Sequence, residues 1–371
     1  MSLSVSRAVI DLNAYAANIQ AVRQLLPPDC GIIAIVKANA YGHGMAPVAR
    51  RAVQEGVQML GVASVEEGVQ LRDAGIKAQI LVLMQPNAGG LPVAVEKNLR
   101  VMISDTAAAE RLGEIARKVN KVVPIHCKID CGMGRQGFDI DYAEREILHL
   151  THVSNIDIEG IAMHFPAAEI REDSFALNQI RSFRHLLKQL EKAGVPYEMS
   201  HAANSPAIIN YPTSAFNMAR PGLITYGVSP IIDAPPPVTL RPVLRWETRI
   251  ALIKELKAGA TIGYGRTYTT AGPSKIAILP VGYADGFKYS LGNNADVLIR
   301  GRRCRVRGAV SMDQITVDVT AVPGVQIEDT ATIIGSDGND NISAQELAQK
   351  AQTIPYDILT GIGPRVRREY V

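Results

Sequence analysis

Several features that define other protein classes are scarce in this chain of 371 residues. No apolar run approaches the roughly 18–20 residues of a membrane-spanning helix, so we expect no membrane span. The opening stretch MSLSVSRAVIDLNAYAANI lacks the charged region, apolar core and small-residue cleavage site of a signal peptide, and we expect a cytoplasmic protein. Basic and acidic residues nearly balance, 39 against 36, which excludes a strongly basic surface for nucleic acid or membrane headgroups.

Cysteine is also sparse. Four cysteines are too few for a disulfide framework in a chain of this length. The stretch HCKIDC, residues 126–131, has a slight likeness to a metal site. Its Cys-x3-Cys spacing has no second Cys or His pair, and Cys127 falls in an apolar alternation. We therefore expect no metal.

What the chain does contain is an ordinary globular composition, with 47% apolar and 20% charged residues. The length favours two domains, although a closed α/β barrel can fill about 250 residues by itself. From residue 31 to about 225, short apolar runs alternate with amphipathic helical patterns. The eight expected strands are 31–36, 58–64, 79–84, 100–105, 123–129, 158–165, 197–203 and 218–224. Eight such units predict a closed (β/α)8 barrel of the TIM type rather than an open sheet.

A proline-rich segment, SPIIDAPPPVTLRPV at 229–243, interrupts this alternation. Beyond it the sequence is rich in β-branched residues and has few helical patterns, which predicts a mostly antiparallel β domain. We expect the barrel over 8–234 and the β domain over 235–371, with residues 1–7 able to pack with the latter. One short helix is expected at 343–352, with the spacing of a capping box at its start.

Lys37 is the first candidate for chemistry. It follows GIIAIV, a run that reads as a strand buried on both faces. A lysine in such a place has a lowered pKa and becomes a usable amine nucleophile, either toward a carbonyl substrate or toward pyridoxal phosphate. The alternative is a solvated lysine in a loop, which describes most lysines.

Polar residues at the ends of later strands help to choose between these possibilities. Reactive groups gather at the C-terminal ends of barrel strands. Asn204 and Ser205 suit a phosphate group, through a hydroxyl and a helix N-terminus. Arg220 could face the cofactor's ring nitrogen, Gly222 allows close approach of the backbone, and His164 could lie along the ring. Together these residues favour pyridoxal phosphate.

Each of these residues also has a plain structural explanation. Asn204 and Ser205 could form an ordinary helix cap, Arg220 a salt bridge, and His164 a satisfied core histidine. Their occurrence at one end of the predicted barrel is the argument against treating them separately.

Eight blocks spread over the whole chain carry a resemblance to a known family. They are AIVKANAYGHG, KIDCGMGRQGF, HAANSPA, NMARPGLITYGVSP, IGYGRTY, LPVGYADGF, VSMDQITVDV and IPYDILTGIGPRVRREY. Their order and spacing resemble those of alanine racemase, a barrel-type pyridoxal phosphate enzyme. Cys131 departs from the Thr or Ser usual in its block; because it is also small, we expect little effect.

The resemblance implies a two-base racemase that interconverts L- and D-alanine. Lys37 would form the Schiff base with the cofactor and then act on one face of the substrate, handling the D isomer. Tyr264 would act on the other face for the L isomer. His164 and Arg220 would support this tyrosine in a chain, and Asp313 would also support it. A guanidinium keeps its proton, so the ring nitrogen facing Arg220 should stay unprotonated.

Substrate and cofactor contacts are implied in the same way. Arg135 and the backbone N–H of Met312 match contacts to the substrate carboxylate, and Lys128 matches a lysine that carries a carbamate in many members. The matched phosphate contacts are Tyr41, Ser205, Gly222, Leu223 and Tyr356.

The resemblance further implies a homodimer in which Tyr264 and Met312 serve the active site of the other subunit. A role in supplying D-alanine as a peptidoglycan precursor would follow. Two alternatives are a pyridoxal phosphate decarboxylase on the same scaffold and a non-catalytic pyridoxal-phosphate-binding barrel. Arg220 and Tyr264 argue against the first, and the second domain argues against the other.

Overall fold

The computed structural model describes residues 6–232 and 234–371. By internal contacts the chain divides into two units. One, the barrel unit, comprises Ala16–Ala40 and Met45–Leu240; the other, the β unit, comprises residues 6–15, Tyr41–Gly44 and Arg241–Val371. The expected boundaries, 8–234 and 235–371, remain predictions. Most of the segment 1–7, which we expected to pack with the β domain, lies outside the described residues.

Eight parallel strands close into a barrel, as predicted. Their order is β5-β4-β3-β2-β10-β9-β8-β6, and pairing of β5 with β6 completes the ring. The strands are β2 (Gly31–Ile35), β3 (Met59–Val62), β4 (Gln79–Val82), β5 (Arg100–Ile103), β6 (Val123–Asp130), β8 (Ile156–Ala162), β9 (Met199–His201) and β10 (Met218–Ala219). A short strand, β7 (Phe138–Asp139), extends the sheet beside β6.

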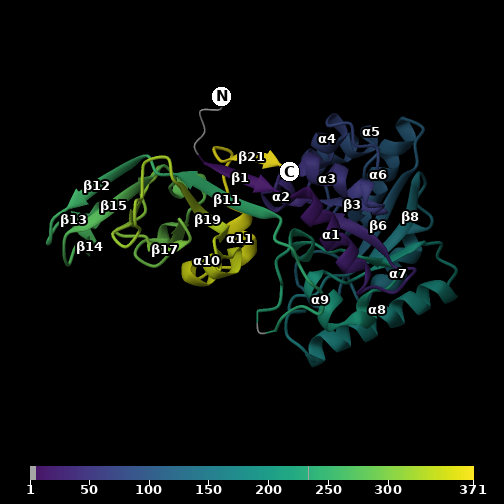
Figure 1. Cartoon of the computed structure of the whole chain (residues 1–371). Helices are drawn as coiled ribbons and strands as arrows, with labels where there is room; N and C mark the ends of the chain where they lie inside the picture. Colours follow the sequence, from purple (N-terminus) through teal and green to yellow (C-terminus); the bar gives the residue numbers. More distant parts are fainter. Residues whose placement is uncertain (1–5, 233) are drawn as a thin grey trace. The chain divides into compact units, whose positions relative to one another are not determined.

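Helices alternate with the barrel strands along the chain, and most of them follow a barrel strand (Figure 1). All five residues of β2 and all four of β3 are buried, as expected for strands covered on both faces. The helices are α1 (Leu12–Arg23), α2 (Lys37–Tyr41), α3 (Met45–Gln54), α4 (Val65–Asp73), α5 (Gly90–Glu96), α6 (Thr106–Lys118), α7 (Ala143–Leu150), α8 (Ser174–Lys192) and α9 (Ser205–Asn210). Within the described ranges, none has the length and apolar character needed to cross a lipid bilayer.

Local signals explain where the longest helix begins and ends. The Asp173 carboxylate accepts hydrogen bonds from the backbone N–H groups of Phe175 and Ala176, which caps α8. Gly194 follows the last turn with a φ of 75°, a left-handed conformation that glycine adopts without strain.

The β unit is mostly antiparallel, as predicted. Its main sheet has the order β17-β16-β19-β11-β1-β21, with β20 beside β19. These strands are β1 (Arg7–Ile10), β11 (Leu244–Arg249), β16 (Asp296–Ile299), β17 (Arg302–Arg305), β19 (Thr330–Asp337), β20 (Asp340–Ile342) and β21 (Arg367–Tyr370). Strand β1 pairs with β11 and β21, so the start of the described chain contributes a strand to this sheet.

Smaller elements complete the β unit. A three-stranded sheet consists of β12 (Leu252–Leu256), β15 (Ser274–Leu279) and β18 (Ile315–Asp318). A two-stranded hairpin consists of β13 (Thr261–Ile262) and β14 (Tyr268–Thr269). Two helices follow, α10 (Ala344–Ala351) and α11 (Pro355–Thr360). The expected cap of α10 is present, because Ser343 Oγ accepts the Glu346 N–H at 3.0 Å.

Candidate active site

Lys37 lies just past the C-terminal end of β2, at the rim of the barrel. The preceding residue, Val36, is fully buried, and its N–H donates to the Gly61 carbonyl of β3. Burial lowers the pKa of the Lys37 amine, the charges of Arg135 and Arg220 lower it further, and Glu67 acts in the opposite direction. The amine is therefore easier to deprotonate than that of an ordinary lysine, as the sequence predicts.

The backbone after Lys37 winds in the left-handed sense. Ala38, Asn39, Ala40 and Tyr41 have φ values of 52°, 53°, 53° and 51°. Such a conformation costs about 1–2 kcal/mol for each L-residue. Two side chains offset this cost: the Glu67 carboxylate accepts the Ala38 N–H at 2.6 Å, and Asn39 Oδ1 accepts the Met45 N–H at 2.9 Å.

Arg220 is the most heavily bonded side chain of the site. Its buried guanidinium donates from Nη1 to the His201 carbonyl and Nδ1, at 2.8 and 2.6 Å. From Nη2 it donates to the carbonyls of Met163 and Ala202 and to His164 Nδ1, at 2.6, 3.0 and 3.2 Å. None of these five bonds uses Nε. The guanidinium is thus fixed in position by its two terminal nitrogens.

Two further titratable groups lie in the field of this arginine. Burial, followed by the charges of Arg220 and Lys128, lowers the pKa of His164 well below its usual value. Burial and the charge of Arg220 likewise lower the pKa of Lys128 well below that of a solvated lysine. His164 is therefore neutral near pH 7, and Lys128 is a buried amine that loses its proton readily.

Arg135 is carried by a tight loop after β6. The Asp130 carboxylate accepts four backbone N–H groups of this loop, from Gly132 to Arg135, at 2.8–3.2 Å. Burial alone would raise the pKa of Asp130, but these hydrogen bonds lower it overall. The side chain of Arg135 is exposed, so its guanidinium is available to an anion while its backbone is held.

A polar cradle lies where β9 and β10 end. Ser205 Oγ is buried and accepts the N–H groups of Gly222 and Ile224, at 2.9 and 3.4 Å. Asn204 caps α9, because its Oδ1 accepts the Ala207 N–H at 3.1 Å. Leu223 is buried at the start of the 3-10 turn Leu223–Tyr226. Ser205, Gly222 and Leu223 therefore converge, as a phosphate site requires.

The candidate residues of the β unit are exposed. Tyr264 follows the β13 strand in a turn where Gly263 and Gly265 have positive φ, and 74% of its surface is accessible. Met312 is 52% accessible, and its carbonyl accepts the Ala284 N–H at 3.0 Å. Neither side chain is held by the packing that surrounds Arg220.

Three other predicted residues of the β unit, Asp313, Tyr41 and Tyr356, have identifiable contacts. Asp313 forms an ion pair with Arg365 at 2.8 Å, so its support of Tyr264 remains a prediction. The rings of Tyr41 and Tyr356 lie 5.7 Å apart. Burial, and then Tyr356, raises the pKa of the Tyr41 phenol, which keeps it a hydrogen-bond donor.

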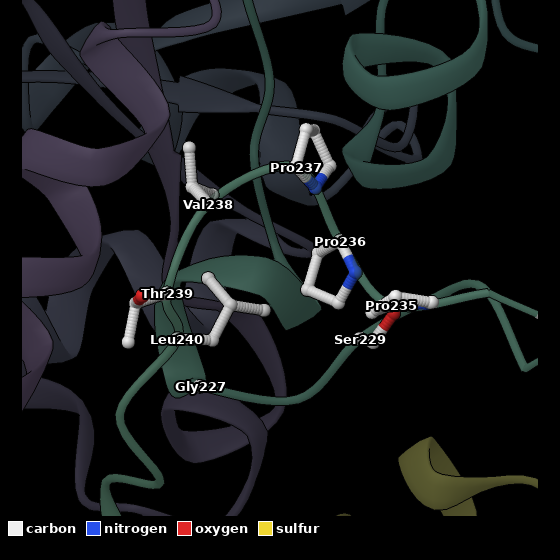
Figure 2. A pocket seen from close by; sticks show the side chains of 8 residues that line it. All are labelled: Gly227, Ser229, Pro235, Pro236, Pro237, Val238, Thr239 and Leu240. Carbon is white, nitrogen blue, oxygen red and sulfur yellow. The ribbon is translucent and has the colours of Figure 1, made fainter.

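A separate surface pocket of about 480 Å³ lies beside the proline-rich segment. Gly227, Ser229 and residues 235–240 line it, and Figure 2 shows proline rings and aliphatic side chains along most of its wall. Among the residues that the structure describes, none of these lining side chains carries a group that ionises near neutral pH. The described wall of this pocket therefore offers no group for acid–base catalysis.

Comparison with known proteins decides the family. Residues 10–230 match the alanine racemase N-terminal domain, and residues 243–370 match its C-terminal domain. An alanine racemase of Halothermothrix orenii is 42% identical, over 98% of this chain and 96% of the relative. The chain belongs to the alanine racemase family.

Solved structures agree with this assignment. An alanine racemase structure from Clostridium difficile 630 has a TM-score of 0.96 and 33% identity, covering 100% of this chain and 97% of that one. The alanine racemase of Bartonella henselae, solved with covalently bound pyridoxal phosphate, has a TM-score of 0.89 and 29% identity, with 99% of each chain covered.

The structure brings together one group of the residues predicted for an alanine racemase. His164, Arg220 and Lys128 interact directly or through their charges, and Lys37 and Arg135 share the same field. Ser205, Gly222 and Leu223 form the cradle described above. Tyr264, Met312, Asp313 and Tyr356 belong to the other unit, the β unit. The roles of all these residues remain predictions.

Sequence reasoning missed several residues of this racemase site. Glu67 holds the turn after Lys37, and the spacing Ser64 to Glu67 at the start of α4 was the available signal. His126, Glu159 and His201 form a buried polar chain that reaches Arg220. His126 belongs to the HCKIDC stretch weighed as a weak metal site; in the described part of the chain, no cluster of three potential ligands is arranged for a metal ion.

Proposed function

We propose that this chain is an amino-acid racemase that uses pyridoxal phosphate to interconvert L- and D-alanine. Membership of the alanine racemase family over both domains supports the activity. The single observation that carries the proposal is the group formed at one end of the barrel by Lys37, His164 and Arg220, whose guanidinium donates five hydrogen bonds. A lysine amine with a lowered pKa beside a fixed cation suits an amine-binding cofactor that carries negative charge.

The residues present fit pyridoxal phosphate. The Lys37 amine would bond to its aldehyde carbon, as the covalent cofactor of the Bartonella relative suggests. The Ser205 hydroxyl with the backbone around Gly222 would hold its phosphate, and the Nε–H of Arg220 would face its ring nitrogen. When bound, the cofactor withdraws electron density from the substrate's α-carbon and so makes the α-proton removable.

Two residues would move protons on opposite faces of the substrate. The Lys37 amine would take or return the α-proton on one face, because its lowered pKa leaves more of it unprotonated. The phenol of Tyr264 of the partner subunit would do so on the other face. The imidazole of His164 is neutral and accepts a hydrogen bond from Arg220. It would therefore transmit the electrostatic influence of the arginine to this phenol.

The substrate carboxylate would be bound from two sides. The exposed guanidinium of Arg135 can form a bidentate pair with it, while Asp130 fixes the backbone of the loop. The N–H of Met312 of the partner subunit would add a second contact. Lys128, buried and easily deprotonated, suits reaction with carbon dioxide to give a carbamate that would hold Arg135.

We also propose that two copies form a homodimer with shared active sites. The exposure of Tyr264 and Met312 supports this, because catalytic and anchoring groups need to be shielded from water during the reaction. The expected location is the cytoplasm, and the expected role is to supply D-alanine for peptidoglycan.

The test is a racemase assay on a panel of small L-amino acids, with wild type and Tyr264→Phe measured side by side. We expect wild type to abolish the optical rotation of L-alanine without releasing carbon dioxide, which excludes a decarboxylase. In D₂O, Tyr264→Phe should still exchange the α-proton of D-alanine through Lys37 while racemisation falls by about 10²–10⁴-fold. Normal racemisation by this variant would show that the two-base assignment is wrong.

A further inference from the structure

A chain of buried polar side chains leads from Arg220 into the barrel. His201 Nδ1 lies 2.6 Å from Arg220 Nη1, and His201 Nε2 lies 2.7 Å from His126 Nδ1. His126 Nε2 in turn lies 3.0 Å from Glu159 Oε2. Arg100, at the start of β5, closes the chain by pairing with Glu159 at 2.7 Å. The chain thus connects the catalytic end of the barrel with the beginning of a strand.

The two ends of this chain determine where every proton in it lies. A guanidinium can only donate, so His201 must accept at Nδ1 and carry its proton on Nε2. That proton is donated to His126 Nδ1, which forces the His126 proton onto Nε2, facing the carboxylate of Glu159. Both imidazoles are therefore neutral Nε2–H tautomers, and every bond has the same direction.

The charges around the imidazoles agree with this assignment. Burial, Arg220, His126 and Lys128 all lower the pKa of His201. For His126, burial lowers the pKa most, Glu159 raises it, and Arg100 and Arg220 lower it. Both rings are fully buried, so a proton added to either would have no solvent to stabilise it. Near neutral pH the chain has a single protonation pattern.

The barrel is locally shaped to admit this chain. Gly160 of β8 faces His126, and a Cβ atom there would approach His126 Nδ1 to 2.3 Å. The pairing of β6 with β8 also shifts register between Ile125 and His126. A bulge of this kind re-aims a side chain. Space and direction for the His126 ring are therefore built into two strands.

We infer that Glu159, acting through His126 and His201, is a positioning residue for the racemase reaction because it fixes the orientation of Arg220. This inference rests on the proposed function. The carboxylate sets the direction of the hydrogen bonds, and His201 consequently always presents an acceptor to the arginine. If that direction reversed, an N–H of His201 would face the donors of Arg220 and displace the guanidinium from His164.

A second buried glutamate of the protein, outside this hydrogen-bond chain, provides a matched control. Glu247 on β11 is buried and pairs with Arg7 and Arg245, each at 3.0 Å, but no histidine among the described residues is bonded to it. Loss of its charge should destabilise the fold as loss of a buried pair does, without reaching the catalytic residues. A purely structural role of Glu159 would make the two glutamates equivalent.

The first experiment is histidine side-chain ¹⁵N NMR on the full-length wild type, with and without pyridoxal phosphate. Signals are assigned by their loss in His126→Asn and His201→Asn. We expect two neutral Nε2–H tautomers that do not titrate between about pH 5.5 and 8.5, in both samples. A protonated ring, or an Nδ1–H tautomer of either residue, would overturn the inference, whatever activity the enzyme has.

The second experiment compares Glu159→Gln with Glu247→Gln in the full-length holoenzyme. We expect Glu159→Gln to lower kcat by about 10–100-fold, change KM for alanine by less than about 3-fold, and shift the pH titration of the cofactor's visible absorption. Glu247→Gln should lower only the thermal midpoint. Equal effects of both variants on kcat and on the absorption titration would overturn the inference.

A third variant tests the position of the His126 ring while leaving the charge of Glu159 unchanged. Gly160→Ala keeps every polar group and forces the His126 ring to move, so it should reproduce the kinetic and spectral changes of Glu159→Gln. Unchanged kinetics in this variant would contradict the inference. If the glutamine variant does not fold, the NMR of the wild type still decides. A wild type that shows the expected tautomers but neither binds pyridoxal phosphate nor racemises alanine would refute the proposed function alone.

Discussion

The barrel and the β unit differ in how they hold their candidate catalytic residues. In the barrel, Arg220 is buried and donates five hydrogen bonds, and the loop of Arg135 is tied to one carboxylate by four. In the β unit, Tyr264 and Met312 are largely exposed. The barrel residues are therefore held by contacts within their own unit, whereas Tyr264 and Met312 are exposed in theirs. The comparison favours an active site assembled from two copies.

The largest expected effect comes from the barrel side. Lys37→Ala removes the only amine we assign to the cofactor bond, so racemase activity should fall by more than about 10³-fold in both directions. The purified variant should also be colourless after incubation with pyridoxal phosphate, with no borohydride-trapped adduct. Retention of a trapped adduct in this variant would mean that another lysine holds the cofactor.

Mixing two inactive variants tests whether the halves of the site come from different subunits. In a heterodimer of Lys37→Ala and Tyr264→Phe, one site would lack both groups and the other would be intact. Refolding an equal mixture should therefore restore about a quarter of wild-type activity, because about half of the dimers are mixed. The two variants refolded separately are the control. No restoration would indicate that Tyr264 serves its own chain.

A moderate loss of barrel stability is expected when the pH is lowered. Burial lowers the pKa of His126, His164 and His201, all in the barrel. A group with a lowered pKa in the folded state stabilises the fold fully above its unfolded pKa of about 6.5, and this stability is lost as the pH falls toward the folded value. Each unit of lowering corresponds to about 1.4 kcal/mol. The barrel should therefore weaken between about pH 6.5 and 5.

Two optical signals allow the stability of the two units to be measured separately. Trp246 is the only tryptophan and is buried on β11, so its fluorescence reports on the β unit, while helical circular dichroism reports mainly on the barrel. Between pH 7 and 5 the dichroism midpoint should fall more than the fluorescence midpoint. Asp340 and Glu346, whose pKa values Arg303 lowers, should cost the β unit stability only below about pH 4.5. Coincident midpoints throughout would contradict this prediction.

The smallest effect is expected at Cys131. Burial raises the pKa of its thiol to about 12, so the group stays protonated. Its backbone carbonyl accepts the Gln179 side chain at 3.0 Å, a bond that a threonine would keep. Cys131→Thr should change kcat/KM by less than about 2-fold and the thermal midpoint by about 1–2 °C. A loss of more than about 5-fold would give this loop a role that burial does not explain.

The fold could be predicted from the sequence because its strands are local patterns. The eight apolar runs gave the eight barrel strands, although the last run, expected over 218–224, forms a strand only at Met218–Ala219 and continues into a 3-10 turn. The capping-box spacing located the start of α10. What the patterns could not give is pairing between distant segments. Strand β1 joins a sheet with β11 and β21 because of contacts that no local window contains.

The candidate site could be predicted only in part, for a similar reason. Strand-end position pointed to Lys37, His164 and Arg220, which the structure shows to be close or coupled by charge. Glu159 and His201 were not found, because a buried histidine or glutamate inside a strand looks like any satisfied core residue. Their importance lies in the direction of their hydrogen bonds, which depends on three separate strands and on Arg220, just past the end of a fourth.

The left-handed coil after Lys37 restricts how this segment can change during evolution. A β-branched side chain at Ala38 or Ala40 would collide with the backbone of a coil wound in this sense, whereas glycine would relieve strain there. Tolerance to substitution at these positions should therefore follow the handedness of the backbone rather than hydrophobicity or size. Residues with no assigned contact to the substrate, such as Ala38 and Ala40, therefore restrict where in the sequence a reactive lysine like Lys37 can be placed.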